Sequence, residues 1–297
     1  MKKGFVLLMF ILGAAACTTV VDFDIPLDKP WVVVNSLFSP DSVWQVKVAY
    51  SKNILDVAPG PNFWQVGNAI VKILDPNNQV IETITPSSDK FNRVLYRGKT
   101  KPLPGQSYTV QVSIKDEPIR QAINKVPMHV PITSVEVDSS RFKSEGEPIE
   151  IDITFKDPKD EKNYYTVKII EDATNLVNKD TIVLTQEIYF EVVEQSLSID
   201  ESGLEKLIND NLFSGRDYTF RTKLYHRRYS YGSQLLRQHV RVVLLSVSEE
   251  YYKYFITKNL QDHASGDPFA QPVQVFTNVE NGLGIFAGYS ASVFKLK

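Results

Sequence analysis

Apolar and polar residues alternate with a period of two along much of this chain. The alternation is clearest over residues 44–50, 108–114 and 149–155. A strand with this spacing turns one face toward a core and the other toward water. More continuous apolar runs over residues 31–34 and 69–74 predict strands that are more fully buried. Clusters of Pro, Gly, Asn and Asp separate these runs, so the pattern predicts a mainly β fold.

The strands before and after residue 126 are predicted to form two domains. Residues 30–126 contain several short strands with turns between them and no convincing helix, which indicates an immunoglobulin-like β-sandwich. The sequence VPMHVP at residues 126–131 interrupts the pattern with two prolines, and we place the boundary there. Strands resume afterwards, so residues 127–297 are predicted to form a second β-rich, sandwich-like domain.

Two short helices are predicted inside the second domain. Ser202 and Glu205 have the spacing of a capping box, and apolar residues then share one helical face, which predicts a helix near residues 202–212. Ser248 precedes two glutamates, which suit the N-terminus of a helix. Apolar residues then recur every four positions, so a second helix is predicted over residues 248–261.

The first seventeen residues, MKKGFVLLMFILGAAAC, have the order of a secretory signal. Two lysines precede an uncharged apolar run at residues 4–12, which is shorter than the about 20 residues of a membrane-spanning helix. Small residues then lead to Cys17. We predict a signal peptide over residues 1–16, lipidation of Cys17, and a tether over residues 17–29. Two or more acyl chains on one residue hold a protein firmly to a membrane.

The signal departs at one position from a bacterial lipobox, which usually has an aliphatic residue three places before the cysteine. This chain has Ala14 there. The alternative is an ordinary secretory signal that is cleaved near Ala16, with Cys17 incidental. Because Cys17 is the only cysteine in 297 residues, no disulfide framework competes for its thiol. This favours Cys17 as a lipid attachment point.

Composition and charge exclude two classes of protein. The chain has 33 basic and 35 acidic residues and a net charge of -2, without the basic excess of a nucleic-acid-binding protein. No run of about 18 apolar residues follows Cys17, so the sequence predicts no transmembrane helix. A hydrophobic fraction of 43% is ample for a packed core.

Residue types that carry catalysis or bind metals show no ordered pattern. The four histidines lack the spacing of a zinc site, and no G-x-S-x-G nucleophile motif occurs. We therefore expect no enzymatic activity, no cofactor and no metal. Residues Asp157–Glu161 carry three carboxylates, which would suit a cation such as calcium. A solvated turn is the favoured interpretation of that segment.

One segment stands out as a candidate surface for contact with a partner. Aromatic and cationic residues gather at a predicted strand end or loop, at Tyr225, Arg227, Arg228, Tyr229 and Tyr231. Exposed Tyr and Arg dominate the energetics of many interfaces. A half-buried strand with these aromatics in the core is an equally compatible interpretation.

Several motifs occur in an order that resembles one known family. They are Asp24–Pro26, Trp31–Asn35, Asp157–Pro158, Asn163–Tyr165, Ser246–Tyr254, Gly266–Phe269 and Asn278–Tyr289. Over nearly its whole mature length the chain resembles Bacteroidota outer-membrane lipoproteins catalogued as a domain of unknown function (number 4249). The resemblance implies an association with TonB-dependent receptors of the outer membrane. It implies no catalytic residues.

From the sequence we expect a non-enzymatic, lipid-anchored protein of the outer membrane that binds a β-barrel receptor of a TonB-dependent transport system. Its ligand and the membrane face that it occupies stay open. One alternative is a secreted carbohydrate- or peptide-active enzyme with an unrecognised site, which a deep pocket of converging carboxylates would favour. The other alternative is a structural or adhesive surface protein.

Overall fold

The computed structural model describes the chain from residue 29 to residue 296 with gaps. The described residues are 29–52, 64–88, 91, 93–138, 148–159, 161–177, 180–193, 206–224, 234–264, 270–271 and 273–296. Cys17 and the predicted signal peptide lie outside them. The predicted contact residues Tyr225, Arg227, Arg228, Tyr229 and Tyr231 lie outside them as well.

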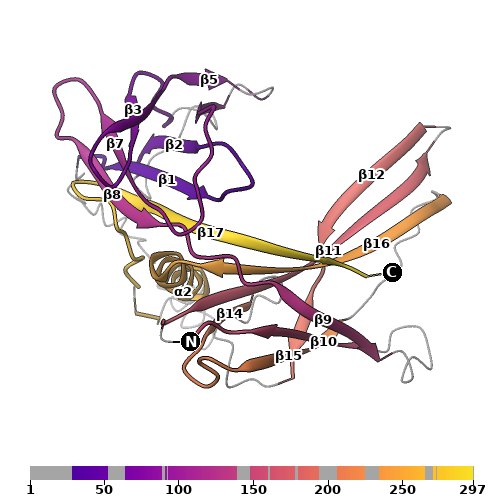
Figure 1. Ribbon diagram of the computed structural model, residues 1–297. Helices are drawn as coiled ribbons and strands as arrows, with labels where there is room; N and C mark the ends of the chain where they lie inside the picture. The colour runs from indigo at the N-terminus through magenta and orange to yellow at the C-terminus, as the bar shows by residue number, and fades with distance from the viewer. Residues whose placement is uncertain are drawn as a thin grey trace, which may run out of the picture.

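Three β-sheets and one helix make up the described part of the chain, so the predicted mainly β, sandwich-like fold is confirmed (Figure 1). The largest sheet has nine strands. Its order is β12 (Asp180–Glu187), β11 (Tyr164–Val177), β16 (Gln234–Val247), β17 (Leu283–Lys295), β1 (Val32–Phe38), β2 (Gln45–Tyr50), β6 (Val94–Arg97) and β5 (Pro86–Ser88), with β14 (Lys206–Asn209) beside β11. Neighbouring strands are antiparallel except for the parallel pair β1 and β17.

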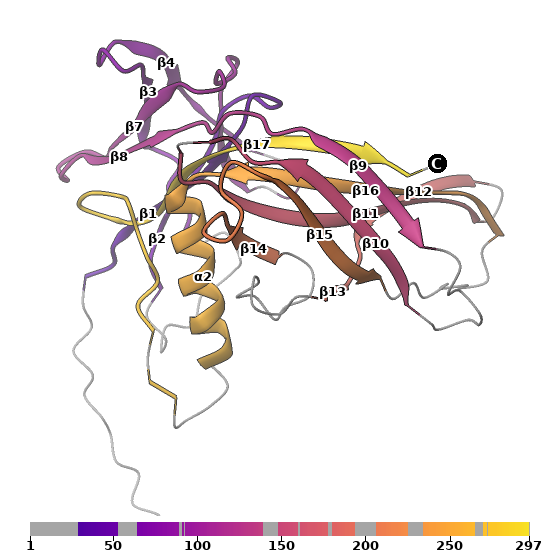
Figure 2. The same cartoon turned by 60° about the horizontal axis from the view of Figure 1, so that its bottom comes forward.

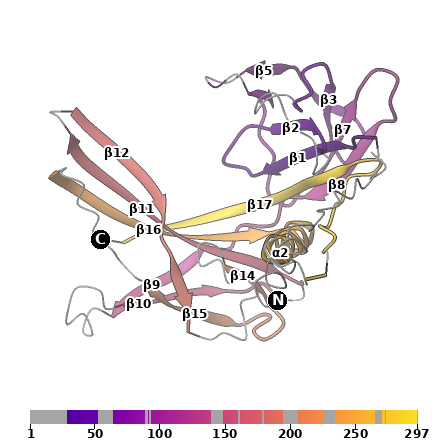
Figure 3. The same ribbon diagram turned by 180° about the vertical axis from the view of Figure 1, so that it is seen from behind.

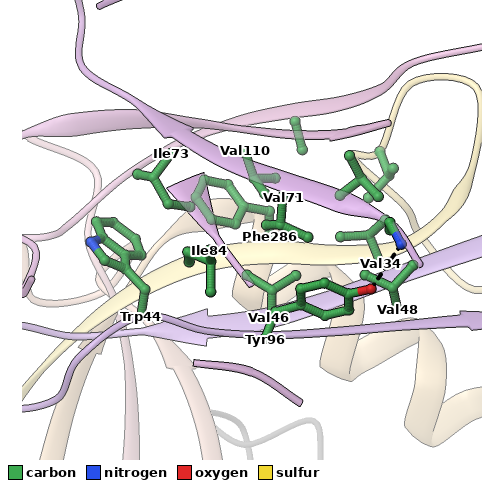
Figure 4. Packing of buried hydrophobic residues seen from close by; sticks show 14 of the residues in the cluster. Val34, Trp44, Val46, Val48, Val71, Ile73, Ile84, Tyr96, Val110 and Phe286 are labelled. Carbon is green, nitrogen blue, oxygen red and sulfur yellow. Dashed lines mark hydrogen bonds between the residues drawn. The ribbon is translucent and has the colours of Figure 1, made fainter. Parts of the chain in front are cut away.

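A four-stranded sheet and one half of the large sheet enclose the first core. The order of this sheet is β4 (Val80–Ile84), β3 (Ile70–Leu74), β7 (Ser107–Ser113) and β8 (Arg120–Lys125). The alternating residues Trp44, Val46 and Val110 are buried there, as their spacing predicts (Figure 4). Tyr96 accepts a hydrogen bond from the N–H of Ala69 at 3.0 Å, so its phenol is satisfied inside the apolar cluster.

A second four-stranded sheet packs on the other half of the large sheet. Its order is β13 (Phe190–Val192), β15 (Asp217–Leu224), β10 (Ile149–Lys156) and β9 (Ile132–Asp138). Ile151, Ile153 and Phe155 turn toward the large sheet and are buried with Tyr165 and Phe220. The strand predicted from the period-two pattern over residues 149–155, with one face in a core, is therefore confirmed.

The helix α2 (Glu249–Ala264) covers the opposite face of the large sheet, beside the ends of β16 and β17 (Figure 2). The Oγ of Ser248 accepts a hydrogen bond from the N–H of Tyr251 at 3.2 Å and so caps the helix. Tyr251 and Tyr252 are buried against the sheet. The predicted helix over residues 248–261 is confirmed. Within the described residues, no helix combines the length and hydropathy that crossing a membrane requires.

The other predicted helix, near residues 202–212, is wrong over its described part. Lys206–Asn209 forms the strand β14, and a turn follows it. The neighbouring residues Leu207 and Ile208 are both buried, but Leu207 belongs to the cluster under α2 and Ile208 to the core of the second sandwich. A strand sends consecutive side chains to opposite faces, whereas a helix would place these two on one side.

The last strand, β17, connects the two sandwiches. It pairs with β1 along its first half and with β16 along its second. Phe286 packs in the first core and Phe294 against the second. Between them, the Oγ of Ser290 donates a hydrogen bond to the carbonyl of Pro127 at 2.6 Å. The predicted domain boundary at residue 127 stays a prediction, but the last strand is part of both sheet packings.

Beyond the second core, the strands β11, β12 and β16 continue as a three-stranded arm. Figures 1 and 3 show this arm projecting away from both sandwiches. β12 forms its outer edge, since it pairs with β11 and no other described strand adjoins it.

Candidate ligand-binding cleft

A cleft of about 1000 Å³ opens at one end of the first sandwich. Segments that are far apart in the sequence meet there. The lining residues are Lys29, Pro30, Trp31, Tyr50, Trp64, Glu117, Pro118, Arg120 and Asn281. Three aromatic rings, one carboxylate and two cations thus face a single hollow. This mixture of apolar walls and a few polar groups is typical of a ligand site.

Backbone hydrogen bonds place the aromatic residues at the mouth. The N–H of Ser51 donates to the carbonyl of Trp31 at 2.7 Å, and the N–H of Trp31 donates back to the Oγ of Ser51 at 2.9 Å. The N–H of Tyr50 donates to the carbonyl of Trp64 at 2.8 Å. Trp31, Tyr50 and Trp64 are therefore brought together by the end of β2. Trp31 keeps 53% of its surface exposed, which is a large apolar area to leave in water.

The carboxylate of Glu117 is held from two sides. Its Oε1 accepts a hydrogen bond from the Tyr50 hydroxyl at 2.8 Å, and its Oε2 lies 2.7 Å from Nη2 of Arg120. The hydrogen bond to Glu117, together with burial, raises the pKa of Tyr50 above its ordinary value. Tyr50 is thereby kept as a protonated donor, and Glu117 is a fixed acceptor that already has a cation beside it.

Arg120 joins two turns, the one between β7 and β8 and the one before β17, into one wall of the cleft. Its Nε donates to the carbonyl of Asn281 at 3.2 Å, and its Nη1 donates to the carbonyl of Pro118 at 2.7 Å. Next to it, Gly282 is required sterically, because a Cβ there would lie 2.8 Å from the carbonyl oxygen of Val32. The guanidinium is buried and acts as a rigid support for Glu117.

The described lining of the cleft offers groups that can stack on a ligand and form hydrogen bonds with it. Acid–base catalysis commonly uses two titratable groups whose environments separate their pKa values. Among the described lining residues, Glu117 is the one carboxylate, and its partner is a permanently charged arginine. The exposed indole of Trp31 and the satisfied polar network instead offer stacking and hydrogen bonding to a bound ring or chain.

Sequence patterns did not indicate that these residues form one site, although Trp31 and Asn281 lie in two of the family motifs. Trp31 was expected to begin a more fully buried strand, but it is the half-exposed lip of the cleft. Glu117 and Arg120 belong to no motif, and Arg120 meets Asn281 across 161 positions. A sequence signal for such a site is weak, since its members come from segments that lie far apart in the sequence.

The acidic segment beginning at Asp157 has a structural role in place of the favoured solvated turn. Asp157 is 1% exposed, and its carboxylate accepts hydrogen bonds from the Tyr165 hydroxyl and from the N–H of Gly215 at 2.8 Å. Burial raises the pKa of Asp157, and burial together with this hydrogen bond raises that of Tyr165. The solvated-turn prediction is therefore wrong at Asp157. Among the described residues, no group of three or more His, Cys, Asp or Glu is placed to hold a metal ion.

Comparison with known proteins gives a family and little else. No curated protein matches the chain. A crystal structure of a Salmonella alpha-2-macroglobulin mutant aligns with a TM-score of 0.24 and 11% identity, over 77% of this chain and 14% of that protein. The chain thus spans a small part of that protein's length, and this similarity is too low to indicate a shared fold. The family described as a domain of unknown function, DUF4249, matches residues 18–294. This chain belongs to the DUF4249 family.

Proposed function

We propose that this chain is a non-enzymatic, lipid-anchored protein of the outer membrane that binds a ligand or partner segment in its aromatic cleft and works beside a TonB-dependent β-barrel receptor. The observation that carries the binding role is the half-exposed Trp31 in a cleft of about 1000 Å³ with a fixed polar network. The order of the N-terminal residues through Cys17 supports the anchor. The resemblance in sequence motifs supports the receptor.

The position of the cleft agrees with a role close to a membrane. Lys29, which ends the predicted tether, lines the cleft. An extended chain spans at most about 3.5 Å per residue, so the residues from Cys17 to Lys29 reach about 40 Å. A lipid at Cys17 would keep the cleft within that distance of the bilayer and would raise its effective concentration beside an integral partner.

The anchor is tested by labelling cells with radioactive palmitate. The wild-type chain is expected to take up label and to sediment with membranes. Cys17→Ser is expected to lose both properties, because the thiol is the proposed site of acylation. Label that persists in Cys17→Ser would remove the anchor from the proposal.

The cleft is tested by isolating the tagged full chain in mild detergent. A TonB-dependent receptor, identified by mass spectrometry and by its change in gel mobility on boiling, is expected to co-purify with the wild type. Trp31→Ala should reduce its recovery about tenfold or more, as loss of a central aromatic contact does in other interfaces. Ile123→Ala is the matched control, since Ile123 is an exposed apolar residue of the same sandwich outside the cleft. Equal recovery with both variants would contradict a role for the cleft, and absence of any barrel would contradict the partnership.

A further inference from the structure

Among the described elements, none covers the outer edge of the arm. All side chains from Thr181 to Glu187 on β12 are exposed, and Ile182, Val183 and Leu184 keep 41%, 62% and 56% of their surface in water. Edge strands of soluble proteins are usually blunted by a charge, a proline or a bulge. The central segment of β12, Thr-Ile-Val-Leu-Thr over residues 181–185, has none of these.

The hydrogen-bonding direction of each β12 residue follows from one bond near its end. The N–H of Ile188 donates to the carbonyl of Ile169 at 2.8 Å, so Ile188 directs its backbone groups toward β11. Antiparallel strands alternate between residues that bond inward and residues that bond outward. The register of β11 and β12 is unbroken, so Thr181, Val183 and Thr185 direct their N–H and C=O groups away from β11.

This outward set is complementary to itself. When two copies of β12 lie antiparallel about a two-fold axis at Val183, Val183 faces Val183 and Thr181 faces Thr185. These pairs contain only outward-bonding residues, so they form about six N–H···O bonds. A shift by one residue would oppose an outward residue to an inward one, and the ladder would not form. Ile182 then lies beside Leu184 of the other copy, which is a favourable aliphatic pair.

We propose that β12 pairs with β12 of a second copy of this chain in this register, so that the two large sheets join edge to edge. Charge is compatible with the pairing, because residues 181–185 carry none and no like charges are opposed. The arm projects from both sandwiches, which leaves the edge open to approach (Figure 3). The inference goes beyond the proposed function, because it involves neither the cleft nor the anchor.

The size of the contact sets its strength. A pairing of five to seven residues on each copy is smaller than the about 1,600 Å² of a standard stable interface. The dimer is therefore weak and depends on protein concentration. Anchored copies, which share a two-dimensional membrane, would pair more readily than free ones.

Site-specific cross-linking tests the register. In the full chain carrying Cys17→Ser, an added cysteine is the sole thiol. Val183→Cys should form a disulfide-linked dimer on mild oxidation, because facing residues of a bonded pair lie about 5.5 Å apart between Cα atoms, within the range of disulfides. Thr185→Cys should not cross-link with itself, since its two copies lie about 14 Å apart along the strands. A mixture of Thr181→Cys and Thr185→Cys chains should cross-link with each other.

Sedimentation measures the association without cysteines. The dimer fraction of the Cys17→Ser chain should rise with concentration, and adding Val183→Pro should lower its association constant at least about tenfold. Proline at this position removes an outward N–H and leaves the inward bonds to β11, which is where edge strands tolerate it. Val183→Thr, which keeps the backbone donor and β-branching, is the matched control. A monomer at all concentrations, or equal cross-linking at positions 183 and 185, would overturn the proposal.

Discussion

At the residue scale, a buried carboxylate joins the end of β10 to the turn before β15. Asp157 accepts hydrogen bonds from the side chain of Tyr165 and the backbone of Gly215. Burying a carboxylate is costly unless such donors surround it. The motif residues Asp157 and Tyr165 therefore have a structural explanation, and they lie at the opposite sandwich from the cleft.

Replacing Asp157 tests this role. Asp157→Ala leaves the Tyr165 hydroxyl and the Gly215 N–H without their acceptor, and a buried unsatisfied donor costs about 1–3 kcal/mol. We expect the free energy of unfolding to fall by about 2–4 kcal/mol in chemical denaturation. Asp152→Ala is the control, because the partly exposed pair of Asp152 with Arg221 is worth less than about 1 kcal/mol. Equal losses in the two variants would contradict the structural role of Asp157.

At the element scale, the start of β17 can lie close to β1 because its second residue is a glycine. Gly284 has a φ of 105°, and a Cβ there would lie 2.2 Å from the carbonyl oxygen of Val34. Both the backbone angle and the space exclude a side chain. The Asn278–Tyr289 motif thus contains a residue that the parallel pairing with β1 requires.

Gly284→Ala should consequently destabilise the chain by about 2 kcal/mol or more, since it combines strain with a steric overlap. The measurement is the midpoint of urea unfolding. Ala291→Gly, in the same strand, should cost only about 1 kcal/mol through chain entropy. A loss for Gly284→Ala no greater than that of Ala291→Gly would mean that β1 and β17 do not approach so closely.

Predictions from local spacing were correct for segments whose buried side chains all enter the same core. Val46, Val110 and Ile153 each point into a single core, so their period of two was readable. The helix near residues 202–212 failed because Leu207 and Ile208 serve different cores. No local pattern distinguishes that arrangement from one face of a helix.

At the scale of the whole molecule, the N-terminal sandwich is completed by the C-terminal strand. Residues 283–288 pair with β1, and Phe286 packs in the core beside Phe38 and Trp44, with ring centroids 4.4 Å and 6.4 Å away. The first domain predicted over residues 30–126 therefore lacks a strand and a core side chain when it is isolated.

The fragment 30–126 is accordingly expected to show no cooperative thermal unfolding by itself, because loss of Phe286 leaves a large cavity and an open edge on β1. The full chain should unfold cooperatively under the same conditions. Adding a peptide of residues 278–297 should restore part of the transition by supplying β17. A fragment with the same Tm as the full chain would show that β17 contributes nothing to this core.

By itself the sequence determined the strands of alternating polarity, the capped helix after Ser248 and the mainly β class, because these follow from spacing over a few residues. The tertiary structure alone decided the parallel pairing of β1 with β17 across 250 positions, and the meeting of Trp31, Glu117 and Arg120 in one cleft. Periodicity reports which face of a segment is buried but not against what. The partner depends on which edges and core volumes match once the chain has folded.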